Sequence, residues 1–342
     1  MNNKNLVSII IPVYNDGKFL ARTLKAVIEQ DYENIEIILV NDASTDNTQN
    51  TAEKILSSSK RAFKIINHEK NLGVSQSRND GLNASNGEYI WFCDGDDIPD
   101  KSFVSILYNK AESENADMVF CNMQIYHENE NRYEKFFSDL FNHDKTLSGE
   151  ECMNLCAVKK SYFASVCNCL AKKDFLCKNS LHFYKNCMSR EDSEFAMKAV
   201  ISATRVAFEK KALYIYIQHS EQSTKSYSNE KNYELFFNHI ILAMYRAVRY
   251  ILRKTKNLRV KNYLLSCHFT ALILKQCKTY IKFEERNKYD KILKTLHHKK
   301  IRQVMLSSTA HFLIKDPELF LNVFLLLYFP NFYYCVRSKK SK

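Results

Sequence analysis

Three aspartates directly follow an apolar stretch in the segment YIWFCDGDD, residues 89–97. The carboxylates of Asp94, Asp96 and Asp97 repel one another unless a cation or hydrogen-bond donors offset their charge. Carboxylate oxygens suit Mg²⁺ and Mn²⁺, and Gly95 permits a sharp backbone turn between them. The competing interpretation is a solvated turn after a strand, where Asp and Gly are common. Taken alone, this stretch supports both interpretations equally.

Two further side chains occupy positions suited to a nucleotide. Asp42 follows the apolar run ILVN, and an acceptor-only carboxylate there can bind an imide N–H or a ribose hydroxyl. The alternative is that Asp42 and Ser44 cap the helix that follows. Arg78 lies on a helical stretch leading back to the strand of Trp91, where its guanidinium can face a phosphate or only solvent.

The segment SREDSEF, residues 189–195, places a carboxylate at the start of another helical stretch. Ser189 and Asp192 stand three residues apart, as in a capping box. Downstream, His219 follows the strand-like run YIYIQ and can contact a metal or a phosphate. The alternative for His219 is an ordinary surface residue at a strand end.

The first 122 residues alternate between strand-like and helix-like patterns. The apolar runs predict strands at 7–14, 35–41, 63–68, 89–93 and 117–122, separated by helices at 17–30, 44–56, 73–84 and 100–114. This alternation indicates βαβ units and a parallel sheet with right-handed crossovers. Ligands of such sheets bind at the carboxyl ends of the strands, where Asn15, Asp16, Asn41, Asp42 and Asp94–Asp97 gather. No glycine-rich phosphate-binding motif follows any of these strands.

Charge and glycine content divide the chain into two parts. Residues 231–342 hold 23 Lys and Arg against 6 Asp and Glu, a net charge of +17, whereas the whole chain carries +12. All six glycines lie within the first 149 residues. We therefore predict one domain over 1–228 and a basic, α-helical C-terminal region over 229–342. Nucleic-acid binding by that region is an alternative, but it lacks glycine-rich or aromatic-basic RNA motifs.

The end of the chain suits a membrane surface. Its longest apolar run is too short to span a bilayer, but aromatics at 328–334 followed by RSKKSK suit an interfacial segment on anionic lipid. We expect the tail 317–342 to associate with membrane; the alternative is an ordinary helical cap with a solvated basic face.

The N-terminus and the cysteines indicate a cytoplasmic protein. Residues 1–5 lead straight into a strand, so no secretory signal is expected. The eleven cysteines lack paired CxxC spacing and are expected to be free thiols. Six lie between residues 152 and 187, where irregular spacing favours thiols over a zinc site.

An ordered set of segments resembles family 2 glycosyltransferases: VSIIIPVYN (7–15), EIILVNDASTDNT (36–48), NLGVSQSRNDGL (71–82), GEYIWFCDGDD (87–97) and SREDSEF (189–195). The resemblance covers about residues 5–225 in the family's order and spacing. It implies the α/β GT-A fold, with a Rossmann-like, mostly parallel central sheet flanked by helices. It also implies an inverting, metal-dependent transfer from a nucleotide-sugar.

The resemblance also implies roles for individual residues. Those in the nucleotide-sugar site would be Pro12, Tyr14, Asn15, Asp42, Arg78, Asp94 and Asp96. Asp94 and Asp96 would form the acidic pair of the DxD motif, and Asp96 or Asp97 would hold Mn²⁺ or Mg²⁺, with His219 as a further ligand. The family's usual arginine near the end of the domain is replaced here by Ile217, which puts that phosphate contact in doubt.

In the family, the residue matching Asp192 supplies the general base. Taking a proton from an acceptor hydroxyl requires a carboxylate on the acceptor side. The processive motif QxxRW is absent, since Trp91 is the only tryptophan. We therefore expect one sugar, from a UDP-sugar, to be added to a growing surface glycan or lipid-linked oligosaccharide, on the inner face of the cytoplasmic membrane. The alternative is a non-catalytic regulator that binds nucleotide-sugars.

Overall fold

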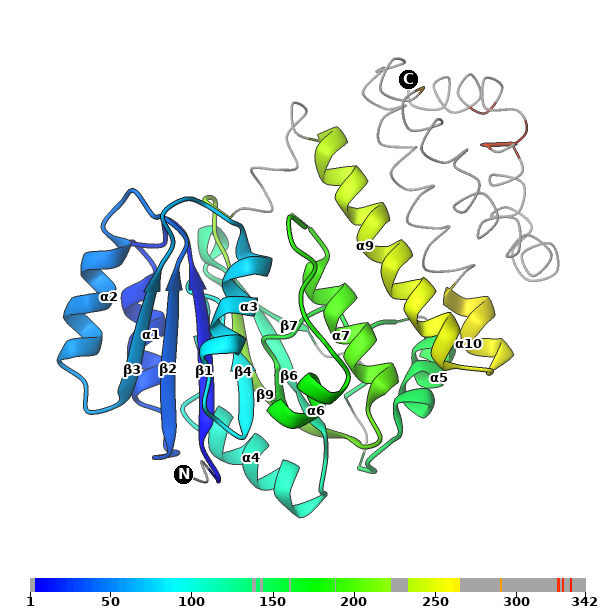
Figure 1. The fold of residues 1–342 in the computed structure, drawn as a ribbon, viewed down its shortest axis with the longest axis horizontal. Coiled ribbons are helices and arrows are strands. Elements are labelled where there is room, and N and C mark those ends of the chain that lie inside the picture. The colour runs from blue at the N-terminus through cyan, green and yellow to red at the C-terminus, as the bar shows by residue number, and fades with distance from the viewer. Residues whose placement is uncertain are drawn as a thin grey trace. The chain divides into compact units, whose positions relative to one another are not determined.

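The computed structural model describes residues 4–136, 140–141, 144–159, 161–187, 189–222 and 233–264, with residues 290, 325, 326, 328 and 333. The chain forms two compact units, Met1–Ser228 and Asn229–Lys342. The first unit is built on a nine-stranded sheet flanked by helices (Figure 1).

The front of the sheet is parallel, as the alternating pattern predicts. Its strands are β1 (Val7–Val13), β2 (Ile35–Asn41), β3 (Ala62–Asn67) and β4 (Tyr89–Phe92), in the spatial order β3-β2-β1-β4. The connecting helices are α1 (Leu20–Ile28), α2 (Thr48–Ser57) and α3 (Val74–Ala84). Val13 pairs with Asn41, and Asn41 with Asn67, so three strands end level with one another. Residues just after these strands therefore share one edge, at the top of Figure 1.

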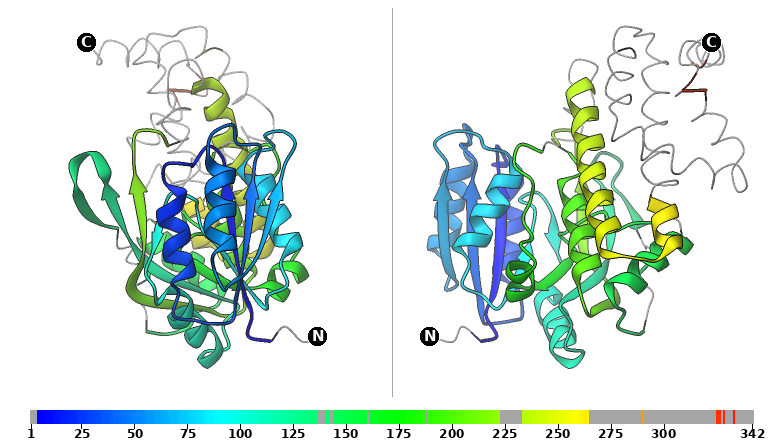
Figure 2. Two further views of the ribbon diagram at one scale, coloured as in Figure 1. Left: turned by 90° about the vertical axis from the view of Figure 1, so that its left-hand side faces the viewer. Right: turned by 45° about the vertical axis from the view of Figure 1, so that its right-hand side comes forward.

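The second half of the sheet is mixed. It contains β5 (Ile98–Pro99), β6 (Met118–His127), β7 (Arg132–Phe136), β8 (Cys169–Lys172) and β9 (Val206–Gln218). Strand β8 lies antiparallel between β4 and β6, whereas β9 runs parallel to β6 and antiparallel to β5. Strands β6 and β7 form a hairpin, closed by a 3₁₀ turn (Glu128–Glu130), that stands out from the sheet (Figure 2, left).

The described part of the first unit also contains the helices α4 (Phe103–Ser113), α5 (Gly149–Lys159), α6 (Lys173–Lys178) and α7 (Glu191–Ser202). Helices α1 and α2 lie on one face of the sheet, and α3 and α7 on the other (Figures 1 and 2). The mostly parallel, helix-flanked sheet confirms the predicted GT-A architecture. The antiparallel β8 and the hairpin were not predicted.

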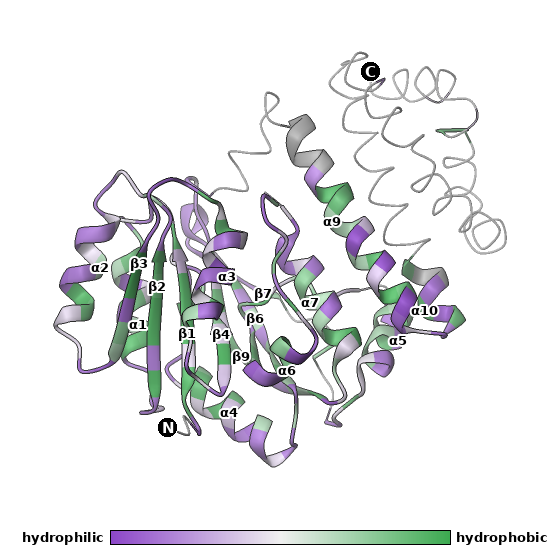
Figure 3. Cartoon of the chain, viewed as in Figure 1, coloured by the Kyte–Doolittle hydropathy of each residue, from purple (hydrophilic) through white to green (hydrophobic). Residues whose placement is uncertain are grey.

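Burial explains why the parallel strands form. Every residue of β1 is buried and β2 is buried at six of its seven positions, as expected for strands covered on both faces. Figure 3 shows the hydropathy of each residue along these strands and helices. Helix α1 buries Leu20, Leu24 and Val27 at helical spacing. Helix α3 approaches β1 so closely that a Cβ at Gly81 would lie 2.3 Å from Ile10 Cγ2. That close approach sets the position of Arg78, one turn earlier on α3.

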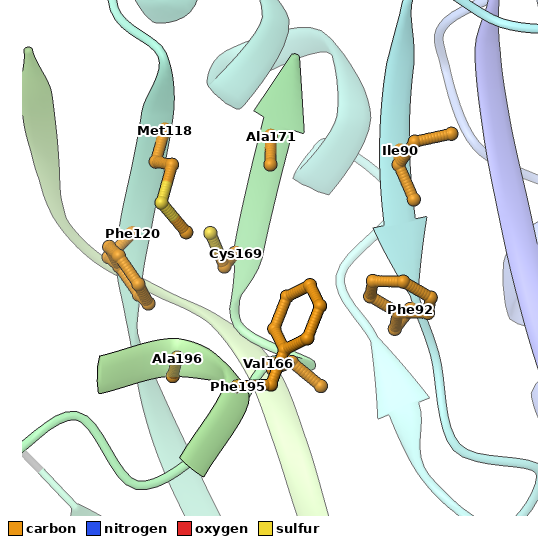
Figure 4. Close-up of a pocket in the computed structure, with 9 residues that line it drawn as sticks. All are labelled: Ile90, Phe92, Met118, Phe120, Val166, Cys169, Ala171, Phe195 and Ala196. Carbon is orange, nitrogen blue, oxygen red and sulfur yellow. The ribbon is translucent and has the colours of Figure 1, made fainter. Parts of the chain in front are cut away.

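Helix α7 is fixed by an apolar layer. Phe195 and Ala196 of α7 face residues of β4, β6 and β8 around a void of about 10 Å³ (Figure 4). Such a void holds at most one water, and its lining is apolar. It is therefore a packing feature of the core. The apolar contacts around it hold the first turns of α7 against the sheet.

The described part of the second unit contains α9 (Tyr233–Lys254) and α10 (Leu258–Tyr263). Buried residues of α9 recur at helical spacing, including Ile240, Met244, Ala247 and Ile251. Among the described residues, none of the helices combines the length and apolar character that crossing a bilayer requires. The predicted membrane-associating tail, 317–342, lies almost entirely outside the described residues.

Candidate active site

Side chains of helix α1 hold the backbone of the DGDD turn (residues 94–97) by hydrogen bonds. The Thr23 hydroxyl lies 2.9 Å from the Gly95 carbonyl oxygen and 2.8 Å from that of Asp97. Arg22 Nη2 donates to the intervening Asp96 carbonyl at 3.1 Å. A Cβ at Gly95 would lie 2.7 Å from Val13 Cγ1, so this turn packs tightly on the end of β1. Two adjacent side chains of α1 thus bind three consecutive carbonyls of the turn.

The Asp97 side chain faces inward. The Tyr214 hydroxyl donates to Oδ2 at 2.7 Å, and the Ile217 N–H donates to Oδ1 at 2.9 Å. Asp97 is almost fully buried; burial, and then the charges of Asp96 and Asp94, raise its pKa. Asp97 therefore braces the turn against β9. Its assignment as a metal ligand stays a prediction, and these contacts favour Asp96 for that role.

The side chain of Asp96 contacts the imidazole of His219. Asp96 Oδ2 lies 3.0 Å from His219 Nε2, and the ring of Phe19 packs on the imidazole with centroids 3.9 Å apart. His219 Nδ1 is buried and has no hydrogen-bond partner among the described residues. This carboxylate and this imidazole come from sites 123 residues apart, a pairing that the sequence suggests only through the resemblance.

Asp96 and His219 fit a divalent cation as two of its ligands. Within the described residues, no three His, Cys, Asp or Glu side chains converge into a complete metal cage. A full cage is unnecessary, because Mg²⁺ in nucleotide-dependent sites is usually held by one or two protein groups together with substrate phosphates. Because Nε2 is the ring nitrogen that faces Asp96, it is the atom of His219 that would bind the cation.

A fourth carboxylate lies beside the turn. Asp16 follows β1 and accepts a hydrogen bond from the Tyr14 N–H at 3.0 Å. Burial, and then the charge of Asp96, raise the pKa of Asp16 to about 7. A nearby cation would favour its ionised form. The sequence places Asp16 at the ligand edge but gives it no role.

Arg78 links the aspartate turn to the start of α7. Its Nη2 donates to Asp94 Oδ1 at 2.8 Å, and its Nη1 donates to Glu191 Oε1 at 3.1 Å and lies 3.8 Å from Asp192 Oδ1. The guanidinium is buried above the Phe183 ring, 5.2 Å from its centroid. The DGDD turn and the start of α7, which are far apart in the sequence, therefore both pair with the guanidinium of Arg78. Arg78 was predicted to lie near the nucleotide, and here it organises the carboxylates around that site.

Helix α7 presents two carboxylates of different character. Glu191 is buried; burial and the neighbouring Asp192 raise its pKa above the ordinary value, although Arg78 opposes the shift. The side chain of Asp192 is 26% exposed. Burial therefore favours the neutral form of Glu191, whereas the Asp192 side chain is partly exposed at the same helix start. The helix begins at Glu191 with no side-chain cap, so the capping-box interpretation of Ser189 is wrong.

Asp42 is buried at the end of β2 and accepts three hydrogen bonds. Donors to Oδ1 are the Leu72 N–H at 2.8 Å and His68 Nδ1 at 2.7 Å, and the Gly73 N–H donates to Oδ2 at 2.8 Å. Asp42 does not cap α2; the Thr48 N–H at that helix start bonds Asp46 instead. The β3–α3 loop is thus folded around the Asp42 carboxylate.

The remaining predicted residues line the same edge. Pro12 is buried on β1, and Tyr14 is 47% exposed just beyond it. Asn15 ties two loops together, because its N–H donates to Ser44 Oγ at 3.0 Å and its Oδ1 accepts from the Thr45 N–H at 2.8 Å. Asn15 therefore shapes the loop beside Tyr14 through its backbone N–H and its side-chain Oδ1.

The comparisons with known proteins agree with this geometry. The family model for glycosyl transferase family 2 matches residues 8–174. Glycosyltransferase GlyG of Streptococcus pneumoniae is 30% identical over 220 residues, which cover 63% of this chain and 71% of the relative. This chain is a family 2 glycosyltransferase. Cholesterol galactosyltransferase of Borreliella burgdorferi is also 30% identical to this glycosyltransferase, over 66% of the chain and 64% of the relative.

Solved structures show the same fold. S. aureus TarS, residues 1–349 in complex with UDP-GlcNAc, matches this glycosyltransferase with a TM-score of 0.70 at 22% identity, over 93% of this chain and 90% of the 1–349 chain. Mannosyltransferase PcManGT from Pyrobaculum calidifontis, in complex with GDP-Man and Mn²⁺, matches with a TM-score of 0.53 at 15% identity. At these identities the likeness establishes the fold.

Proposed function

We propose that this glycosyltransferase moves one sugar from a nucleotide-sugar, with inversion, onto a hydroxyl of a growing surface glycan or lipid-linked oligosaccharide. The observation that carries the proposal is the Arg78 bridge, which brings Asp192 of α7 to the aspartate turn on the sheet edge. UDP is the favoured nucleotide because TarS, which shares the fold, binds UDP-GlcNAc. The alternative of a non-catalytic regulator has no observation in its favour.

Each group has a distinct part in the proposed reaction. Asp192 takes the proton of the acceptor hydroxyl, so that its oxygen can attack the anomeric carbon from the face opposite the leaving diphosphate. Glu191 and Arg78 hold the Asp192 carboxylate at the opening. Asp94, fixed by Arg78, lies on the donor side with Asp96.

A divalent cation held by Asp96 and His219 would supply positive charge to the departing diphosphate. The protein's own contribution there is positional. Arg22 and Thr23 fix the backbone of the turn, and Phe19 fixes the His219 ring. These contacts place the side chains of Asp96 and His219 next to each other.

The basic C-terminal region and its aromatic end support a second part of the proposal. We place the enzyme in the cytoplasm, peripherally bound to the inner face of the cytoplasmic membrane, where lipid-linked acceptors are assembled. The net charge of +17 over residues 231–342 would attract anionic headgroups.

A donor screen tests the proposed reaction. The purified protein is incubated with Mn²⁺ or Mg²⁺ and UDP-, GDP- or TDP-sugars, and release of the nucleoside diphosphate is measured with and without a lipid-linked glycan acceptor. We expect release from UDP-sugars that depends on the cation and increases with acceptor. No release from any donor with either cation would contradict the proposal.

A further inference from the structure

A histidine to which the sequence analysis gave no role in the site lies between two carboxylates near the carboxyl ends of the parallel strands. His68 follows β3, and its backbone N–H donates to the Asn41 carbonyl at 2.9 Å, which sets it beside Asp42. Its Nδ1 lies 2.7 Å from Asp42 Oδ1 and its Nε2 lies 3.1 Å from Asp80 Oδ2. The imidazole is only 7% exposed. A histidine bonded through both ring nitrogens is fixed in position and in ring orientation.

The second carboxylate is itself held in place. Asp80 lies on α3, and its Oδ1 accepts from Gln76 Nε2, one turn earlier, at 2.8 Å. Both of its oxygens are therefore engaged, one by Gln76 and one by His68. A chain of hydrogen bonds runs from α3 through His68 to the end of β2. Since α3 also carries Arg78, one helix supports both ends of the ligand edge.

The hydrogen bonds to Asp42 leave one acceptor position of its carboxylate free. A carboxylate oxygen offers about two lone-pair directions. His68 and the Leu72 N–H fill those of Oδ1, whereas Oδ2 receives only the Gly73 N–H. One direction of Oδ2 is left for a single outside donor. An imide N–H, as in uracil, supplies such a donor, whereas the corresponding ring nitrogen of cytosine is an acceptor.

We propose that His68, backed by Asp80, is a positioning residue that fixes the plane of the Asp42 carboxylate and so directs the free lone pair of Oδ2 at the nucleotide base. The inference rests on the proposed function, because it assumes that a nucleotide binds at this edge. His68 acts through Asp42 and touches neither the sugar nor the acceptor. Its effect therefore falls on donor binding and on the choice of base, leaving the rate of transfer unaltered.

The side-chain amides of Asn and Gln distinguish the two ring nitrogens. Asn at position 68 places its N–H₂ near the site of Nδ1 and can still donate to Asp42. Gln places its N–H₂ near the site of Nε2, where it reaches Asp80 and not Asp42. Phe preserves the ring without donors. His182→Phe is the matched control, because His182 is exposed and bonds the Ser180 carbonyl.

UDP and CDP binding are measured by calorimetry on the full-length variants with Mn²⁺ present, alongside donor KM and kcat. We expect His68→Phe and His68→Gln to weaken UDP binding about tenfold and to reduce the preference for UDP over CDP. His68→Asn should stay within about threefold of wild type. KM should rise while kcat stays within about twofold, and His182→Phe should change neither. In an Asp42→Ala background, His68→Phe should weaken UDP binding no further.

Several outcomes would overturn the inference. The first is a folded His68→Phe variant that binds UDP as tightly as wild type. The second is weaker UDP binding by His68→Asn than by His68→Gln. The third is a loss of UDP affinity on adding His68→Phe to Asp42→Ala that equals the loss in the wild-type background. If His68→Phe fails to fold, the order of the Asn and Gln variants still decides. Wild-type protein that binds no UDP would overturn the choice of UDP as the nucleotide, on which this inference rests, whereas the proposed transfer itself fails only if no donor is used.

Discussion

At the scale of single residues, the site depends on the buried guanidinium of Arg78, which lies among several carboxylates. Arg78 faces Asp94 and Glu191 at hydrogen-bond distance, with Asp192 slightly farther away. Burial disfavours its charge, but these carboxylates together raise its pKa. Charges in such a cluster are stable only while each has a partner.

Replacing Arg78 by Gln should therefore be severe. It leaves buried carboxylates without their cation, and loss of one partner of a buried ion pair costs about 3–5 kcal/mol. Urea unfolding of the apo protein measures this loss. The control is Arg132→Gln, whose pairs with Glu130 and Glu134 are solvent-exposed and should contribute little. Equal losses in the two variants would show that Arg78 does not hold the cluster together.

Glu191 gives a pH-dependent signature. Because its pKa is raised in the fold from an ordinary 4.5, the folded protein keeps a proton that the unfolded chain releases. The free energy of unfolding must then fall as pH rises from about 4.5 through the raised value. Glu191→Gln removes this dependence, so its stability relative to wild type should increase from pH 5 to pH 8.

Urea midpoints at several pH values, without metal or nucleotide, measure that difference. Glu53→Gln, an exposed change on α2, is the control and should show no such trend. The stability of Glu191→Gln relative to wild type could instead stay constant with pH, or fall as pH rises. Either result would mean that Glu191 is not protonated in the fold.

At the scale of elements, α1 acts as a support for the DGDD turn. Thr23 is fully buried and is the only side chain among the described residues that bonds both the Gly95 and Asp97 carbonyls. An unsatisfied buried acceptor costs about 1–3 kcal/mol. Helix α1 therefore couples the position of Asp96 to the packing of the sheet.

Thr23→Val keeps the shape of the side chain and removes the hydroxyl. We expect a loss of about 1–3 kcal/mol in unfolding free energy and a higher donor KM, because the turn carrying Asp96 loosens. Thr51→Val on α2, where the hydroxyl accepts only a long bond from Asn47, is the matched control. An unchanged donor KM with the expected loss of stability would confine Thr23 to a structural role.

The sequence predicted the parallel half of the sheet because each of its elements carries a local signal. Buried β-branched runs marked β1 and β2, and helical spacing marked α1 and α3. It did not predict β8, whose sequence CLAK has no β-branched or aromatic residue, or the hairpin, whose β7 is exposed and polar.

The same limit applies to the site. DGDD and Asp42 were found because they follow strands. Thr23, Arg22 and His68 were missed because their roles depend on which residues the fold brings near them, and nothing local distinguishes them. The roles within DGDD were also undecidable from sequence, because Tyr214, which binds Asp97, lies 117 residues away.

At the scale of the whole molecule, a mildly acidic catalytic unit is joined to a strongly basic region. Electrostatic attachment predicts binding to anionic vesicles that weakens with salt. Replacing Arg337, Lys339, Lys340 and Lys342 by Ser should reduce co-flotation with such vesicles. Replacing four exposed lysines of the first unit, Lys25, Lys54, Lys60 and Lys64, is the control and should leave flotation unchanged. Equal flotation by both variants would contradict attachment through the tail.

The central claim is that Asp192 is the base, held at the aspartate turn through Arg78. The measurement that tests it most directly compares single-turnover transfer and donor binding in Asp192→Asn. Loss of a general base typically costs about 10²–10⁴-fold in rate. Asp174→Asn, an exposed aspartate in the first turn of α6, controls for loss of a helix-start charge. We predict a loss of transfer in that range with UDP affinity within about twofold of wild type. Transfer within tenfold of the wild-type rate would contradict the account.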